Sequence, residues 1–177
     1  MQYKRLTRIS TIAVLLIGIL ALLIVFASAC GGNPVPAMTV YYQIGQTAQT
    51  SQQLLTIVSV DRTPNYFVAG LMNSIAHSHV DAPPSTKFII IEATVFNTGQ
   101  GALGVSRNDF SLKDSEGRVY HTVAYKGLDN YADKKLSTGQ TNYGHIAFTV
   151  PDIAAGFELS CVLQGSTPVL GVWQLPY

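Results

Sequence analysis

The chain has 177 residues, of which 47% are hydrophobic, and a formal net charge of +1. This length is typical of a single domain and is sufficient to bury a core. After residue 30 the basic residues are scattered among carboxylates, and only Lys134 and Lys135 are adjacent. Because phosphate backbones are bound by clustered positive charge, the composition argues against nucleic acid as a partner.

The N-terminal segment has the order of parts found in an export signal. Three basic residues come first: Lys4, Arg5 and Arg8. An apolar run over residues 12–26 follows, and then the tetrapeptide Ala-Ser-Ala-Cys at residues 27–30. Residues 1–29 are therefore predicted to be a helical signal peptide, and the rest of the chain is expected to work outside the cytoplasm.

The tetrapeptide resembles the lipobox of bacterial lipoproteins, with Ala27 where leucine is usual. This resemblance implies cleavage before Cys30, acylation of its sulfur, and a lipid anchor on the extracytoplasmic face of the cell membrane. Two other fates remain open. An ordinary signal peptidase could cut after Ala29, or the segment could stay as a membrane helix, although the apolar run is shorter than the ~20 residues that span a bilayer comfortably.

Only one other cysteine occurs, Cys161. Alternation in residues 157–163 places Cys161 on the same face as Phe157, Leu159 and Leu163, which predicts a buried and chemically inert thiol. If Cys30 is acylated, no second cysteine is left with which Cys161 could form a disulfide. A Cys30–Cys161 disulfide is the alternative, and it would exclude acylation.

Residues 30–38 are predicted to be a lipidated cysteine followed by a short tether, because the stretch contains glycine and proline and has no apolar period. From residue 39 to 177 the pattern has period two with turn residues between short apolar runs, which is typical of an all-β sandwich or barrel. Strands are expected near residues 39–45, 52–61, 87–97, 108–113, 118–124, 142–150, 157–164 and 169–175.

Three of these segments give sharper expectations. Residues 87–97 are apolar on both faces and should form a central strand. Residues 109–121 should form a hairpin that turns at 114–117, where Gly117 permits a positive φ. The strand that begins at Gly144 should end at Pro151, because proline cannot continue a ladder of hydrogen bonds.

Residues 44–47, 87–97, 109–117 and 144–151 together resemble an uncharacterised extracellular domain family of bacteria and archaea. That family is commonly found on lipoproteins and is related in fold to the mycobacterial immunoprotective extracellular antigen. The resemblance implies an immunoglobulin-like β-sandwich of about seven to eight strands, and it brings no catalytic residues. Residues 65–85 look longer than the corresponding connection in the family, so a function particular to this chain is expected there.

Two sets of residues are candidates for that function. His77, His79 and Asp81 would share one face of an extended segment and could offer two imidazoles and a carboxylate to a metal ion, and a polar surface loop is the competing interpretation. Aromatic residues in connections suit contact with an envelope protein or a glycan, or else they cap the core. These residues are Tyr66, Phe67, Tyr125 and Tyr131.

The sequence contains no nucleophile elbow, phosphate-binding glycine loop or His-Glu-x-x-His motif. We therefore expect a membrane-anchored, non-catalytic binding domain that needs no cofactor. The alternative is an envelope protein that binds a metal or small ligand through the 65–85 loop.

Overall fold

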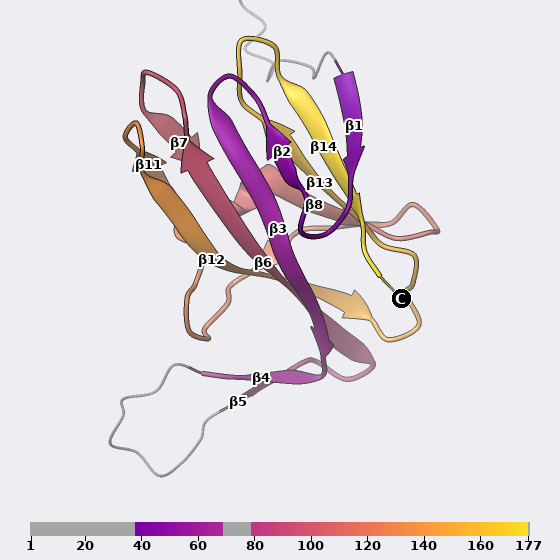
Figure 1. Ribbon diagram of the computed structural model, residues 1–177. Coiled ribbons are helices and arrows are strands. Elements are labelled where there is room, and N and C mark those ends of the chain that lie inside the picture. The colour runs from indigo at the N-terminus through magenta and orange to yellow at the C-terminus, as the bar shows by residue number, and fades with distance from the viewer. Residues whose placement is uncertain (1–37, 69–78, 177) are drawn as a thin grey trace, which may run out of the picture. The chain divides into compact units, whose positions relative to one another are not determined.

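Alternating apolar and polar side chains produce strands through most of the residues that the computed structural model describes, which are 38–68 and 79–176. The strands form two five-stranded sheets that face each other (Figure 1). The first sheet has the order β1 (Met38–Tyr42), β14 (Val169–Gln174), β13 (Glu158–Leu163), β8 (Phe110–Lys113) and β9 (Val119–Tyr120). The second has the order β10 (Thr122–Val123), β12 (Thr141–Pro151), β6 (Thr86–Asn97), β3 (Gln53–Thr63) and β2 (Thr47–Gln49).

Two short ribbons and one 3-10 turn complete the described part of the chain. One ribbon pairs β7 (Leu103–Val105) with β11 (Lys134–Leu136), and the other pairs β4 (Asn65–Phe67) with β5 (His79–Asp81). The 3-10 turn η1 spans Arg107–Asp109. Cys30, the signal segment and nearly all of the tether lie outside the described residues. Within residues 38–68 and 79–176, no helix has the length and apolar character that a bilayer span requires.

Each of the eight expected strands has a counterpart, but one of them is divided between the sheets. The chain at 118–124 forms β9 in the first sheet, breaks at His121, and continues as β10 in the second. The short strands β2, β4, β5, β7 and β11 were not expected, because two or three residues are too few to show a period. The prediction of a central strand at 87–97 is confirmed, since β6 pairs with β3 on one side and β12 on the other.

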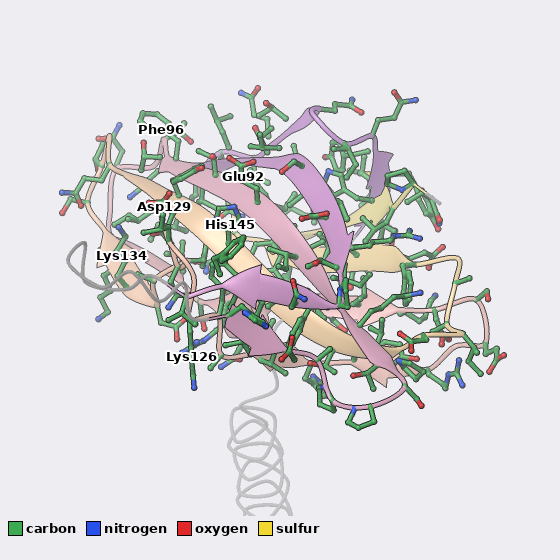
Figure 2. The ribbon with its side chains drawn as sticks, turned by 90° about the horizontal axis from the view of Figure 1, so that it is seen from below. Glu92, Phe96, Lys126, Asp129, Lys134 and His145 are labelled. Atoms are coloured by element: carbon green, nitrogen blue, oxygen red, sulfur yellow. The ribbon has the colours of Figure 1, made fainter. Side chains whose placement is uncertain are left out.

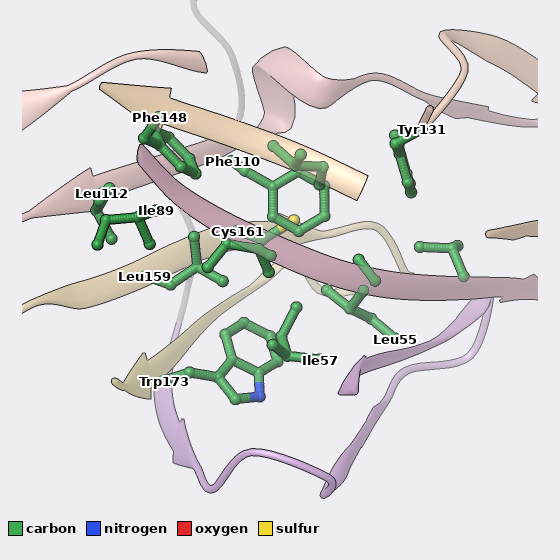
Figure 3. Close-up of a cluster of buried hydrophobic side chains, with 14 of the residues drawn as sticks. Leu55, Ile57, Ile89, Phe110, Leu112, Tyr131, Phe148, Leu159, Cys161 and Trp173 are labelled. Carbon is green, nitrogen blue, oxygen red and sulfur yellow. The ribbon is translucent and has the colours of Figure 1, made fainter. Parts of the chain in front are cut away.

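The main core lies between the two sheets (Figure 3). Its largest side chains include Trp173, Phe148 and Phe157, and the inward residues of β12 are buried as expected up to Pro151. Cys161 is a free thiol within this cluster. Burial raises the pKa of the Cys161 thiol, so it stays protonated, and the expectation of a buried cysteine is confirmed.

A β-bulge in β3 decides which of its side chains face outward. Ile57 pairs with the core residue Ala93, but after the bulge at Val58 it is Ser59 that pairs with Glu92. The extra residue shifts the alternation by one position, so Ser59 and then Asp61 face the outer side of the second sheet. The bulge therefore builds part of the site described below.

The predicted hairpin at 109–121 is confirmed, and its turn is organised by a buried carboxylate. Gly117 has φ +82°, and the side chain of Asp114 is almost fully buried. Asp114 Oδ1 accepts from the backbone N–H groups of Glu116 (3.0 Å) and Arg118 (2.9 Å). Asp114 Oδ2 accepts from Arg118 Nε (2.7 Å) and from the hydroxyl of Tyr120 (2.8 Å).

This arrangement predicts a loss of stability in acid. Burial acts to raise the pKa of Asp114, but the hydrogen bonds from Tyr120 and Arg118 and the Arg118 charge outweigh it and lower the pKa from 3.8 to about 2. The folded state therefore binds this proton more weakly than the unfolded state. The ionised Asp114 therefore adds to the free energy of unfolding. This added stability is complete above the unfolded pKa of 3.8 and is lost as the pH falls toward 2. We expect the Tm of the protein to fall across this window, and Asp114→Asn to start lower but to show a shallower fall.

Candidate functional site

The predicted metal ligands are only partly visible in the structure. His77 lies outside the described residues. His79 and Asp81 are both on β5, and His79 Nε2 lies 3.3 Å from Asp81 Oδ1 as an exposed pair. Among residues 38–68 and 79–176, no three His, Cys, Asp or Glu side chains converge as a metal site would require. The described geometry thus pairs these two side chains with each other.

The four aromatic residues expected at a contact surface occupy different environments. Tyr131 is 2% exposed and packs edge-on against Phe110 in the main core, with ring centroids 5.6 Å apart. Tyr66 is also buried. Both rings are covered by other parts of the fold, Tyr131 in the main core and Tyr66 in a second apolar cluster. Tyr125 is half-buried, and Phe67 is exposed.

The β4–β5 ribbon explains the burial of Tyr66. This ribbon belongs to the segment that the sequence marked as unusually long, and its Tyr66 ring packs on Phe88 (5.0 Å) and on Tyr125 (4.7 Å). The Tyr66 hydroxyl donates to the carbonyl of Ala124 (3.4 Å) and accepts from the N–H of Lys126 (3.3 Å). Together with Ile90 and Ala147 these residues form a second apolar cluster on the outer face of the second sheet. The ribbon therefore covers one part of that outer face and leaves the adjacent part exposed.

The exposed part carries a polar cluster that spans three neighbouring strands (Figure 2). Glu92 on β6 lies opposite Ser59 on β3 and His145 on β12 in the strand register. Glu92 Oε2 accepts from Ser59 Oγ (2.7 Å), and Glu92 Oε1 accepts from the hydroxyl of Tyr143 (2.7 Å). The carboxylate is thus fixed in orientation at the middle of an open sheet face.

His145 connects this cluster to the loop that precedes β11. Its Nδ1 lies 3.2 Å from the carbonyl of Leu128 and 3.3 Å from that of Asp129. Because carbonyl oxygens only accept, Nδ1 carries the proton, and in the neutral ring Nε2 keeps its lone pair. The backbone of His145 also accepts from Tyr131 N–H (3.1 Å) and donates to the Asp129 carbonyl (2.6 Å). His145 is therefore held in place by hydrogen bonds to both its ring and its main chain.

The electrostatics of the cluster keep Glu92 ionised. Hydrogen bonds from Ser59 and Tyr143 lower the pKa of Glu92, and these outweigh a small opposing effect of burial. The same bond raises the pKa of Tyr143, because Glu92 holds the phenolic proton. Burial raises the pKa of Tyr125, and the negative charges of Asp129 and Asp61 add to this. This face thus combines aromatic rings with persistent negative charge.

Sequence reasoning did not single out Glu92, Tyr143 or His145 as site residues. The available signal was Glu92 itself, the only charged side chain within the apolar run from Phe88 to Phe96. A carboxylate at the middle of a central strand must face out or be paired, because burying it alone is costly. Its partners come from β3 and β12, which are distant in sequence.

Two five-stranded sheets that face each other across a shared core define an immunoglobulin-like β-sandwich domain. The chain belongs to the family described as "Domain of unknown function (DUF4352)", whose model matches residues 42–167. It matches none of the curated proteins with which it was compared.

Solved structures with similar folds are distant in sequence. An uncharacterised β-sandwich protein from Clostridium difficile 630 is 15% identical with a TM-score of 0.53, and the match covers 81% of this chain and all of that one. The yjhA protein of Bacillus subtilis is 17% identical with a TM-score of 0.56, and the match covers 76% of this chain and 99% of the other. The ycdA protein of B. subtilis, provisionally described as a lipoprotein, is 15% identical with a TM-score of 0.52. That match covers 71% of this chain but only 37% of ycdA.

Proposed function

We propose that this protein is a membrane-anchored extracytoplasmic lipoprotein whose β-sandwich is a non-catalytic interaction domain. In this proposal the contact surface is the exposed outer face of β12, β6 and β3, beside the β4–β5 ribbon. The observation that carries it is the Ser59–Glu92–Tyr143 hydrogen-bonded cluster, which fixes an ionised carboxylate and a partly exposed ring on an open face. Side chains that are already fixed lose little conformational entropy on binding, so such a cluster is suited to contact.

The anchoring part of the proposal is supported by the lipobox-like residues 27–30, which follow a basic and apolar leader. Two or three acyl chains would hold the domain at the membrane almost permanently, whereas one chain would not. The proline-containing tether would then keep the domain close to the lipid surface.

Replacing Cys30 with alanine should abolish metabolic labelling by a palmitate analogue and release the protein from the membrane fraction. The matched control is Cys161→Ala, which removes the only other thiol and should leave labelling unchanged because Cys161 is buried in the core. Equal labelling of wild type and the Cys30 variant would contradict lipid anchoring at this residue.

The contact surface can be tested by photo-crosslinking in intact cells. A benzophenone amino acid at Val58, the 43% exposed bulge residue of β3, should crosslink the full-length protein to a discrete envelope component. Val162 on β13 of the first sheet is 40% exposed and provides the matched control, which should give no such product. Crosslinks of equal yield from both positions, or from neither, would refute a contact face on the second sheet.

A further inference from the structure

Carboxylates are neutralised unevenly over the described surface. In the first sheet and its turns each of several acids has a basic partner: Asp114 and Glu116 pair with Arg118, and Glu158 pairs with Lys113 at 2.7 Å. Asp133 likewise pairs with Arg107 at 3.2 Å. These acids are already neutralised, so a cation approaching that side of the molecule gains little from them.

The carboxylates around the polar cluster differ in this respect. Within residues 38–68 and 79–176, neither Glu92, Asp61 nor Asp129 has a Lys or Arg at ion-pair distance. Asp61 occupies the next outward position of β3 after Ser59, and Asp129 contacts His145 through its carbonyl. Figure 2 shows Glu92, His145 and Asp129 gathered near one another beside the β4–β5 ribbon. These three carboxylates therefore place negative charge without a Lys or Arg partner around the polar cluster.

Three rings border the same charge. The ring of His145 lies 5.3 Å from that of Tyr125 and 6.4 Å from that of Tyr143. Tyr143 is 45% exposed, and its hydroxyl is fixed on Glu92. Aromatic faces attract cations through their quadrupole, and an adjacent carboxylate adds a charge-assisted hydrogen bond. The chemistry of the face is thus complementary to an ammonium or guanidinium group.

The shape of the face decides between a small cation and a larger partner. A site for a small molecule normally encloses most of its ligand. A hollow of about 490 Å³ lies among Tyr42, Ile44 and Leu175, and none of the cluster residues lines it. An open sheet face can instead bind a group that is carried by a protein, because the rest of that protein supplies the additional contact area.

We propose that this face binds a lysine or arginine side chain of a partner protein. The Glu92 carboxylate accepts hydrogen bonds from the cationic group. The rings of Tyr143, His145 and Tyr125 flank the aliphatic and charged parts of the partner's side chain. Two acceptor positions of Glu92 are used by Ser59 and Tyr143, and a carboxylate offers about four, so positions remain for the ligand. This inference rests on the proposed function and specifies the chemistry of the partner.

The test uses full-length protein in nanodiscs of zwitterionic lipid and a fluorescent peptide of three Gly-Arg repeats. Its isostere in which citrulline replaces arginine keeps the shape and removes the charge. We expect the arginine peptide to bind at least about tenfold more tightly, and Glu92→Gln to remove this difference. Tyr143→Ala should weaken binding several-fold. Glu158→Gln, the same substitution on a neutralised carboxylate of the first sheet, should leave binding unchanged.

Three results would overturn the inference. These are equal binding of the two peptides, an equal loss in Glu92→Gln and Glu158→Gln, and full competition by free arginine ethyl ester at the peptide's own concentration, which would indicate a small-molecule site. The crosslinking experiment at Val58 separates the two proposals. Crosslinks from Val58 together with any of these results would leave the contact face standing and refute only the basic side chain.

Discussion

Replacing Gly144 with alanine is expected to destabilise the fold by about 3 kcal/mol. A Cβ at this position would lie 2.4 Å from the Asp129 carbonyl oxygen, 2.5 Å from the Tyr131 nitrogen and 2.7 Å from the Asn130 carbonyl carbon. All three are backbone atoms, so no side-chain rotation can relieve the contact. The loop at 128–131 would have to move away from β12, and the hydrogen bonds that hold His145 would be lost with it.

Urea unfolding followed by the fluorescence of the single tryptophan, Trp173, measures this effect. Gly104→Ala in β7 is the matched control, because a Cβ there meets no atom within 4 Å and the change should be within about 0.5 kcal/mol of neutral. Since the loop carries the carbonyls that orient His145, Gly144→Ala should also reduce crosslinking from Val58 under conditions where the variant remains folded. A stability equal to that of the Gly104 variant would mean that the loop does not pack on β12.

Replacing Trp173 with alanine should cost about 3–5 kcal/mol, the usual range for removing a large buried ring. Trp173 is fully buried and stacks on Tyr42 with ring centroids 5.2 Å apart. Gly171 lies against the same ring and has no side chain with which to fill the resulting cavity. The neighbouring residues can therefore collapse only partly.

Trp173→Phe should be much milder, at about 1–2 kcal/mol, because most of the aromatic ring is retained. The indole Nε1 has no hydrogen-bond partner among the described residues, and an unpaired buried donor is itself unfavourable. Phenylalanine loses contact area but also removes that donor, so the two effects partly cancel. Circular dichroism is the appropriate probe, because both substitutions remove the tryptophan. Destabilisation by Trp173→Phe well above this range would show that the indole N–H is hydrogen-bonded in the folded protein.

The uneven neutralisation of charge gives the two sheets different roles. In the first sheet the salt bridge between Lys113 and Glu158 joins β8 to β13, so the charges there act within the domain. In the second sheet Glu92 is bound by neutral hydroxyls, which orient the carboxylate without cancelling its charge. Glu158 is thus neutralised within the first sheet, whereas Glu92 keeps the charge that the proposed contact with a cationic partner requires.

The sequence alone determined the all-β class, the central position of β6, the β8–β9 hairpin and the burial of Cys161. Each of these follows from local alternation or from a turn residue, and both signals are contained in consecutive residues. The leader, Cys30 and the tether were predicted from residue order, and all of them except Met38, the first residue of β1, lie outside the described residues.

Only the tertiary structure decided what surrounds Glu92. The bulge at Val58 turns Ser59 outward, strand pairing brings β3 and β12 to either side of β6, and the 128–131 loop crosses at Gly144. The hydrogen bonds to Glu92 join residues that are distant in the chain, 33 positions apart for Ser59 and 51 for Tyr143. The same long-range packing buried Tyr66 and Tyr131, whose position in connections had left both a contact surface and capping of the core open. A periodic pattern reports which face a side chain occupies, whereas the neighbours that it meets there depend on which strands pair and which ribbon folds over the sheet.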